Sequence, residues 1–208
     1  MELGDIGDAV RQDFDAKTAA REEGLAASRL AIRSCGNAIR ALHRYEAPRA
    51  DELLQDAKSA LDEARSALGP HPELLHAGFV HDAEKEYAEA RITHALVTGA
   101  AFPSLEQVGV GTAAFVKGMA EAIGEVRRHI LDLMRRGELE RCEELLSAMD
   151  EIYYLLTSMD YPDGITLGLR RLTDVARSII ERTRGDFTTS TIQSSLRDAL
   201  ERRMPDAG

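Results

Sequence analysis

The stretch Phe115-Val-Lys-Gly-Met-Ala-Glu-Ala-Ile-Gly-Glu-Val-Arg-Arg-His-Ile-Leu-Asp-Leu133 has the clearest periodicity in the chain. Its large apolar residues recur at steps of four and three, as on one face of an amphipathic helix. They are Phe115, Met119, Ile123, Val126, Ile130 and Leu133. At about 100° per residue, Glu121, Glu125, Arg128 and Asp132 fall on the opposite face. We therefore predict a helix that buries one stripe and keeps a charged face away from the core of its own chain.

Helix-stopping and turn residues divide the rest of the chain into segments of helical length. Examples are Gly69-Pro-His-Pro72 and Tyr161-Pro-Asp-Gly164. We predict seven helices, over residues 5–45, 49–68, 72–98, 108–136, 138–158, 164–184 and 188–203. No repeat or low-complexity linker separates them, so residues 1–208 are predicted to form one all-α domain. We expect an elongated antiparallel bundle whose last few residues are disordered.

The composition agrees with helices and limits the classes of function. Aromatic residues make up 5% of the 208 residues and only six residues are Pro, which favours helices over β-structure. The formal net charge of −10 argues against a simple basic protein that coats DNA. It leaves room for a local basic patch or for phosphates bridged by metal. The basic residues are 22 Arg and four Lys, and Arg suits forked recognition of phosphate.

Two cysteines, Cys35 and Cys142, are too few for a disulfide framework and too isolated for a zinc site. No apolar run approaches the ~18 residues of a membrane span, and the N-terminus has no basic region followed by an apolar stretch. These features predict a soluble protein of the reducing cytoplasm that is not exported and has no membrane partner.

A second charged pattern lies in Asp82-Ala-Glu-Lys-Glu-Tyr-Ala-Glu-Ala-Arg91. On a helix, Asp82, Glu86, Glu89 and Thr93 fall within roughly 60° of arc. Three carboxylates repel one another unless a cation sits among them, and Mg²⁺ prefers carboxylate oxygens and waters. Such an ion polarises a phosphoryl oxygen and supplies a bound water as nucleophile. An ordinary acidic surface is the alternative that this segment leaves open.

Other patterns carry weaker signals. Glu73-Leu-Leu-His76 has the spacing of di-iron carboxylate bundles, but the neighbouring Glu125-Val-Arg-Arg-His129 is one residue too long to complete such a site. Gly109-Val-Gly111 lacks the further residues of a phosphate-binding loop. Charged residues line one side of the predicted helix 164–184, where a ladder of opposite charges is the simpler interpretation.

Three strings together resemble the family of translin and translin-associated factor X, especially its short archaeal members. They are FVHDAEKEYAEAR (residues 79–91), FVKGMAEAIGEVR (115–127) and MDYPDGITLGLRRLTDVARSIIERTRGD (159–186). The resemblance runs from about residue 20 to residue 186 and is clearest in the last third. It implies a seven-helix all-α protein that assembles into a hollow homo-octamer and binds single-stranded RNA or DNA.

The resemblance also implies an activity. In the translin-associated factor X branch, the assembly is a Mg²⁺-dependent endoribonuclease with carboxylates facing the interior. The Glu-x-x-Glu-Ala element of that branch matches Glu86-Tyr-Ala-Glu89-Ala90, whereas the non-catalytic translin branch lacks the first glutamate. A later family element matches Gly118 to Glu125, with Glu121 in place of an Asp and Glu125 in direct agreement.

The expected function is therefore cleavage of single-stranded RNA with Mg²⁺ or Mn²⁺. Glu86, Glu89, Glu121 and Glu125 are the predicted catalytic and metal-binding residues. The arginines predicted to contact the RNA backbone are Arg127, Arg128, Arg170, Arg177 and Arg184. The alternative is a homo-oligomer that binds single-stranded RNA or DNA without cleaving it.

Overall fold

Every regular element in the described part of the chain is a helix, as the sequence predicts. The structure, a computed structural model, describes residues 3–76 and 78–202. The long helices are α1 (Leu3–His43), α2 (Ala47–Leu68), α4 (Gly78–Thr98), α6 (Thr112–Arg136), α7 (Leu139–Thr157) and α9 (Leu169–Glu201). Single helical turns are α3 (Pro72–Leu75), α5 (Leu105–Val108) and α8 (Asp163–Thr166). The expected disorder of the last few residues concerns positions outside the described residues.

Two predicted helices begin later than expected. The segment 72–98 is divided into the turn α3 and the helix α4. The segment 108–136 begins within α5, which Ser104 and Gln107 open with a capping box and Gly109 closes at a φ of 68°. Helix α6 then starts after Gly111 and ends at Gly137, whose φ of 78° suits a glycine.

The last two predicted helices, 164–184 and 188–203, are one helix, so the predicted break at Gly185 is wrong. Arg127 spans this glycine from α6. Its Nη1 donates to Thr183 Oγ1 at 2.9 Å and its Nη2 to Asp186 at 2.8 Å. These contacts hold the backbone helical on both sides of a residue that costs about 1 kcal/mol in a helix. Asp163 does not cap this helix directly: its Oδ1 accepts from the backbone N–H of Gly168, after which α9 begins.

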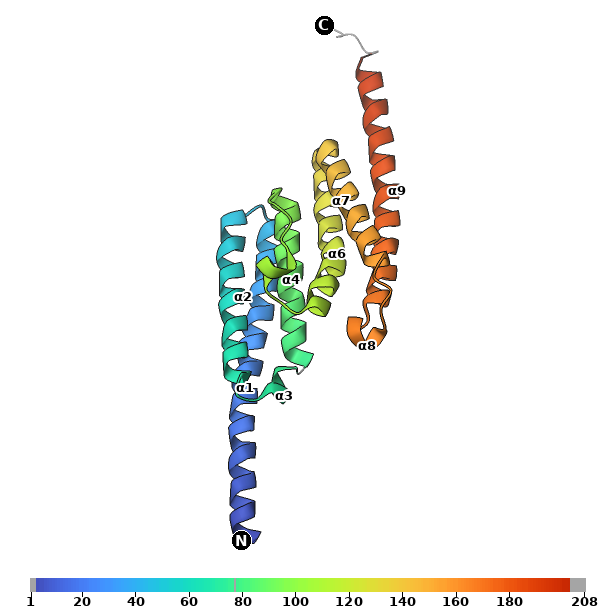
Figure 1. Ribbon diagram of the computed structural model, residues 1–208. Helices are drawn as coiled ribbons and strands as arrows, with labels where there is room; N and C mark the ends of the chain where they lie inside the picture. Colours follow the sequence, from blue (N-terminus) through green and yellow to red (C-terminus); the bar gives the residue numbers. More distant parts are fainter. Residues whose placement is uncertain (1–2, 77, 203–208) are drawn as a thin grey trace.

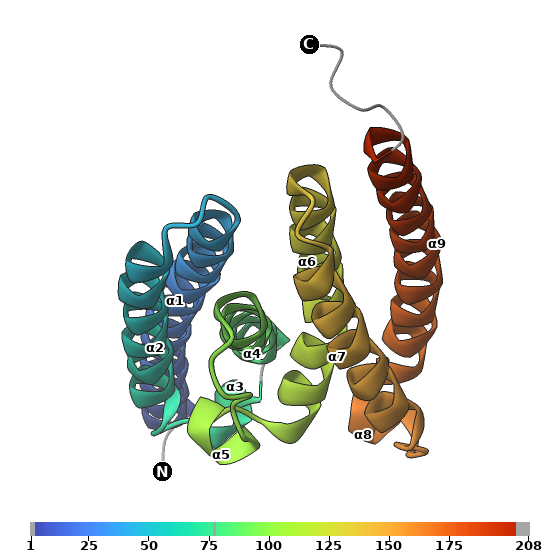
Figure 2. The ribbon, with the colours of Figure 1, turned by 90° about the horizontal axis from the view of Figure 1, so that it is seen from above.

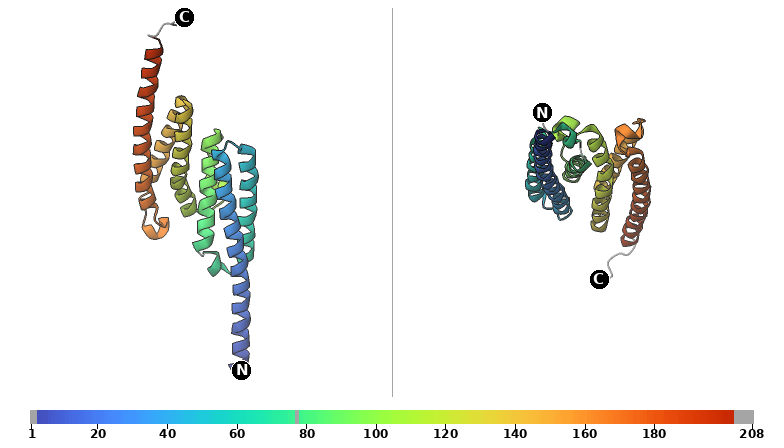
Figure 3. Two further views of the ribbon diagram at one scale, coloured as in Figure 1. Left: turned by 180° about the vertical axis from the view of Figure 1, so that it is seen from behind. Right: turned by 90° about the horizontal axis from the view of Figure 1, so that it is seen from below.

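The helices form a row, which Figure 2 shows from above. Helices α1 and α2 pair as an antiparallel hairpin, α4 packs between this hairpin and α6, and α6 packs against α7 and α9 (Figure 1). Buried apolar residues from all six long helices form one continuous core, in which Cys35 and Cys142 are free thiols. The N-terminal part of α1 and the C-terminal part of α9 extend past the other helices at opposite ends (Figures 1 and 3).

The pair α4 and α6 departs from the antiparallel pattern, because the connection through α5 returns the chain before α6 begins. The two helices run parallel (Figure 1), and the contacts His81–Lys117 and Lys85–Glu121 advance together by four residues on each helix. Their backbones approach closely at Gly118. A Cβ atom there would stand 2.7 Å from Ala88 Cβ, from the backbone N of Glu89 and from the carbonyl O of Lys85.

None of the described helices is long and apolar enough to cross a lipid bilayer.

Candidate metal centre and nucleic-acid interface

Three of the four predicted site carboxylates converge where α4 and α6 meet. One carboxylate oxygen from each of Glu86, Glu89 and Glu121 lies within 4.8 Å of the other two. Glu86 and Glu89 are three residues apart and therefore share a face of α4. Glu121 follows Gly118 by three residues on α6, so the close approach of the backbones at this glycine brings its side chain to the pair.

Glu125 lies one turn further along α6 and is not a member of this group. His43, near the end of α1, contacts it with Nε2 2.6 Å from Glu125 Oε2. The hydrogen bond from His43 lowers the pKa of Glu125, and the positive charge of Arg128 adds to this effect. Glu125 is consequently held as an ionised carboxylate at the edge of the cluster.

Lys85 places a positive charge inside the cluster. Its Nζ donates to Glu86 Oε1 at 2.9 Å and also to Glu121 Oε2. The lysine side chain is only 13% exposed. Burial lowers its pKa, but the hydrogen bonds to the two carboxylates outweigh burial and raise the pKa overall, so the group stays charged.

Glu89 is the buried member of the group, with 9% of its surface exposed. Burial raises its pKa to about 8, and the negative charges of Glu86 and Glu121 contribute to the increase. At neutral pH this carboxyl group therefore holds a proton while no additional cation is near. A second cation beside the group would favour its ionised form.

The donor set fits a hard divalent cation. Three carboxylate groups at this spacing are the ligands that Mg²⁺ and Mn²⁺ prefer, and no thiol or imidazole belongs to the group. Two other acidic residues considered in the sequence lie outside it. Asp82 is exposed on α4, and Glu73 pairs with Lys17 at 3.0 Å. The face of α4 that the sequence predicted thus contributes two ligands rather than three.

Lys117 and His81 lie one turn before the carboxylates, one on each helix. Lys117 Nζ of α6 is 3.3 Å from His81 Nε2 of α4. Burial lowers the pKa of His81, and the charges of Lys117 and Lys85 lower it further. The contact between α4 and α6 thus has a lysine–histidine pair in one turn and the carboxylate cluster in the next.

Three of the five predicted RNA-binding arginines are engaged within the chain. Arg177 Nε lies 2.9 Å from Glu181, and the ladder interpretation of this helix face holds for that pair. Arg184 Nη2 lies 2.7 and 2.6 Å from the two carboxylate oxygens of Asp150. Arg127 joins α6 to α9 across Gly185, as described above, through its hydrogen bonds to Thr183 and Asp186.

The other two, Arg128 and Arg170, are exposed, and no ion pair involves them among the described residues. Arg128 lies close enough to Glu125 to lower its pKa. Arg170 lines a cavity between the end of α7 and the start of α9, together with Asp160, Tyr161 and Asp174. Of the five arginines, these two have guanidinium groups available to a ligand.

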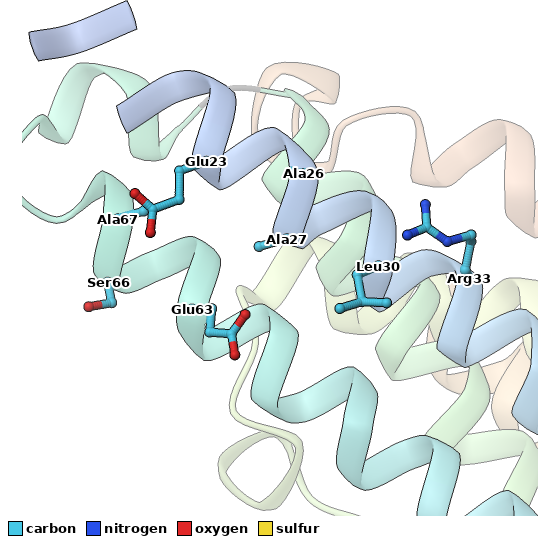
Figure 4. Close-up of a pocket in the computed structure, with 8 residues that line it drawn as sticks. All are labelled: Glu23, Ala26, Ala27, Leu30, Arg33, Glu63, Ser66 and Ala67. Atoms are coloured by element: carbon cyan, nitrogen blue, oxygen red, sulfur yellow. The ribbon is translucent and has the colours of Figure 1, made fainter. Parts of the chain in front are cut away.

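A separate groove between α1 and α2 does not share this chemistry (Figure 4). Glu23, Leu30 and Arg33 line it from α1, and Glu63 and Ser66 from α2. Figure 4 shows the two carboxylates and the arginine well separated along the groove. It contains no convergent ligand set and is not the candidate site.

Two side chains of the candidate site were not identified from the sequence. Lys85 lies inside the acidic segment 82–91. The carboxylates of this segment need a cation among them, and this requirement could have pointed to the lysine. His43 gave no signal, because it lies 82 residues before Glu125 in the sequence and only the tertiary structure brings the two side chains together.

No protein-family model matches the chain. An uncharacterized protein of Methanocaldococcus jannaschii is 29% identical over 189 residues, which cover 89% of this chain and 83% of that protein. Two solved structures of AfC3PO, one of them a complex with duplex RNA, are each 31% identical at a TM-score of 0.82. The match covers 89% of this chain and 96% of the chain in the RNA complex. The structure of apo-NeC3PO has a TM-score of 0.80 over 88% of this chain, and at 18% identity it shows a likeness of fold alone.

Proposed function

Because the chain belongs to the translin/C3PO family, we propose that it is a metal-dependent endoribonuclease that cleaves single-stranded RNA inside a hollow homo-octamer. The observation that carries the proposal is the convergence of Glu86, Glu89 and Glu121 within 4.8 Å. The RNA complex of AfC3PO supports RNA as the ligand, and because its RNA is a duplex, the substrates to test include both strand forms.

The three converging carboxylates would hold Mg²⁺ or Mn²⁺, which would polarise a phosphoryl oxygen and activate water. Glu89 would release its proton on loading, because its raised pKa depends on burial beside two negative charges. Glu125 would act as the general base. His43 engages its Oε2, and among the described residues no donor engages Oε1, which is left to accept a proton from the attacking water.

The exposed arginines would bind and orient the strand. Arg128 projects from α6 beside Glu125, so a phosphate near the cluster would be within reach of its guanidinium group. Arg170 would act farther away. Arg127, Arg177 and Arg184 would have to exchange internal partners for RNA, so we assign them a smaller share of the binding.

A second function, binding of single-stranded RNA or DNA without cleavage, is favoured by a specific observation. Lys85 already supplies a positive charge to Glu86 and Glu121, so these carboxylates are compensated without metal. Glu121 also stands where the family element has an Asp. Measuring binding and cleavage in the same samples distinguishes the two functions.

The test is a cleavage assay on labelled single-stranded and duplex RNA with Mg²⁺, with Mn²⁺ and with EDTA. Glu86→Gln keeps the shape of the side chain and removes its charge. We expect it to abolish cleavage while leaving RNA binding in EDTA within about twofold of the wild type. Asp82→Asn is the matched control, because Asp82 is an acidic residue of the same helix outside the ligand group.

Cleavage that persists in EDTA, or in Glu86→Gln at the wild-type rate, would overturn the metal mechanism. Metal-independent binding of RNA or DNA without cleavage by the wild type would establish the second function. Failure to bind any nucleic acid would remove both.

A further inference from the structure

Lys85 occupies space that a divalent cation would need. Its Nζ donates to oxygens of Glu86 and Glu121, which are two of the three members of the ligand group. Mg²⁺ binds carboxylate oxygens at about 2.0–2.1 Å. A cation bound to the same oxygens would therefore stand against the ammonium group. Because two positive charges repel strongly at that distance in a half-buried site, the two cannot share these oxygens.

The neighbouring turn offers the ammonium group another place. His81 precedes Lys85 by four residues on α4, and Lys117 precedes Glu121 by four residues on α6. Since the helices run parallel here, the His81–Lys117 pair lies about 6 Å along the helix axis from the pair formed by Lys85 and Glu121. Two of the four lysines in the chain thus lie in adjacent turns of the contact between α4 and α6.

The charges of two acidic residues, Asp82 and Glu84, reach His81, and Glu84 already has partners. Glu84 accepts from Arg65 Nη2 at 2.6 Å and from the backbone N–H of Gly111 at 3.1 Å. It is therefore not available to neutralise a second lysine. Of these two carboxylates only the exposed Asp82 is left for an ammonium group arriving beside Lys117, so two lysines leave one positive charge, which a phosphate of RNA can take up through charge-assisted hydrogen bonds.

We propose that Lys85 is an exchangeable counter-ion, which leaves Glu86 and Glu121 when a divalent cation binds and joins Lys117 and His81 in a binding site for a backbone phosphate. The four-carbon stem of lysine allows this change by side-chain rotation. The inference rests on the proposed function for the metal and the RNA, but it does not require cleavage.

The exchange couples the two ligands. A divalent cation releases the ammonium group that binds phosphate, and phosphate in turn keeps that group away from the carboxylates. By linkage, each ligand raises the affinity for the other by the same factor. Ordinary screening by salt has the opposite effect and weakens the binding of RNA.

The test compares the wild type with Lys85→Met and Lys117→Met, and uses Lys58→Met as the control. Lys58 pairs with Asp62 on the exposed face of α2, away from the contact between α4 and α6. Titration calorimetry measures the affinity for Mn²⁺. Fluorescence anisotropy measures the binding of a single-stranded 2′-O-methyl oligoribonucleotide, in Mn²⁺ and in EDTA at matched ionic strength. A gel verifies that the oligonucleotide stays intact.

We expect Mn²⁺ to raise the affinity of the wild type for the oligonucleotide by about tenfold. Lys85→Met is expected to bind Mn²⁺ about tenfold more tightly, because its competitor is gone, and to lose the Mn²⁺-dependent gain in RNA affinity. Lys117→Met is expected to lose the gain without tighter binding of Mn²⁺. Lys58→Met should match the wild type in both measurements.

Unchanged Mn²⁺ affinity in Lys85→Met would overturn the exchange, and a full gain in RNA affinity in both Lys85→Met and Lys117→Met would overturn the phosphate site. A protein that shows the coupling but cleaves nothing would retain this inference and lose the nuclease proposal. Binding of Mn²⁺ by Lys85→Met but not by the wild type would support competition between Lys85 and the cation. If neither the wild type nor Lys85→Met binds Mn²⁺, the inference fails.

Discussion

In the folded protein without metal, the ionised form of Glu89 is less favourable than the protonated form up to a pH of about 8. Its pKa is about 8 in the folded chain, against an ordinary value of 4.5. Between these two values the folded state holds a proton that the unfolded chain has lost. Its contribution to stability therefore falls as the pH rises from 4.5 to about 8, and stays at its most unfavourable above that.

Glu89→Gln should remove this penalty, because the amide resembles the protonated acid in shape. In EDTA, we expect the variant to match the wild type near pH 4.5 and to exceed it at pH 8 by up to a few kcal/mol in free energy of unfolding. Urea unfolding across this pH range measures the difference. A constant difference from pH 4.5 to pH 8 would contradict the buried-acid interpretation. In Mn²⁺ the advantage should shrink, since only the wild type keeps all three ligands.

The residues of the site divide into those that periodicity could predict and those that only packing reveals. Glu86 and Glu89 share a face of one helix whatever the tertiary structure, so their spacing sufficed to pair them. That Glu121 meets them followed from the family resemblance, because no spacing rule relates residues of two helices. Neither helical spacing nor the family resemblance predicted that Lys85 lies among the carboxylates. Its position on the helix does not decide which way a long, flexible side chain turns.

At the scale of helices, the site depends on the contact between α4 and α6 at Gly118. Gly118→Ala would place a Cβ atom 2.7 Å from atoms of Lys85, Ala88 and Glu89, two of them backbone. Overpacking of this kind costs about 1–3 kcal/mol, which exceeds the gain of up to about 1 kcal/mol from replacing glycine in a helix. We expect lower stability in thermal unfolding and, because Glu121 moves away from α4, weaker binding of Mn²⁺ by calorimetry.

Gly124→Ala is the matched control on the same helix. The nearest atom to its new Cβ would be Ile179 Cδ1 at 4.0 Å, an ordinary contact. This variant should be as stable as the wild type or slightly more stable. If Gly118→Ala behaved like Gly124→Ala, the close approach would not be what assembles the site.

Helix boundaries were predictable where local chemistry decides them and not where another helix does. Gly137 ends α6 at a positive φ, and its backbone N–H donates to carbonyl groups of the last turn of the same helix. This end depends on local sequence alone, and its predicted position is correct to one residue. Gly185 looked equally able to end a helix, yet Arg127 of α6 binds residues on both sides of it. The parallel direction of α6 relative to α4 could likewise not be predicted from local sequence, because it depends on the path of the connection through α5.

At the scale of the molecule, the distribution of charge matters more than its total. The net charge of −10 includes the carboxylates gathered between α4 and α6, where Lys85 offsets part of their charge. Lys117 and His81 lie one turn away in the same contact between the two helices. An acidic protein can therefore present a local site for a phosphate chain, which net charge alone argued against.

The two projecting helix ends carry apolar stripes that nothing in the described chain covers. On α1 the exposed residues are Leu3, Ile6, Val10 and Phe14, and on α9 they are Ile192, Leu196 and Leu200. Each series repeats at steps of three or four, so it forms one face of its helix. Contiguous exposed apolar surface of this kind is typical of contacts between proteins. Both stripes are therefore candidate contacts for the proposed homo-octamer.

Charged substitutions on these stripes should lower the mass of the assembly. We expect the wild type to run near eight times the 22.8 kDa of one chain in size-exclusion chromatography with light scattering. Phe14→Glu and Leu196→Glu would each bury a carboxylate in a contact, at a cost of several kcal/mol, and should give smaller species with unchanged helical circular dichroism. Phe102→Glu, at an exposed loop residue away from both stripes, should keep the full mass. Retention of the full mass by both stripe variants would place the contacts between copies elsewhere on the molecule.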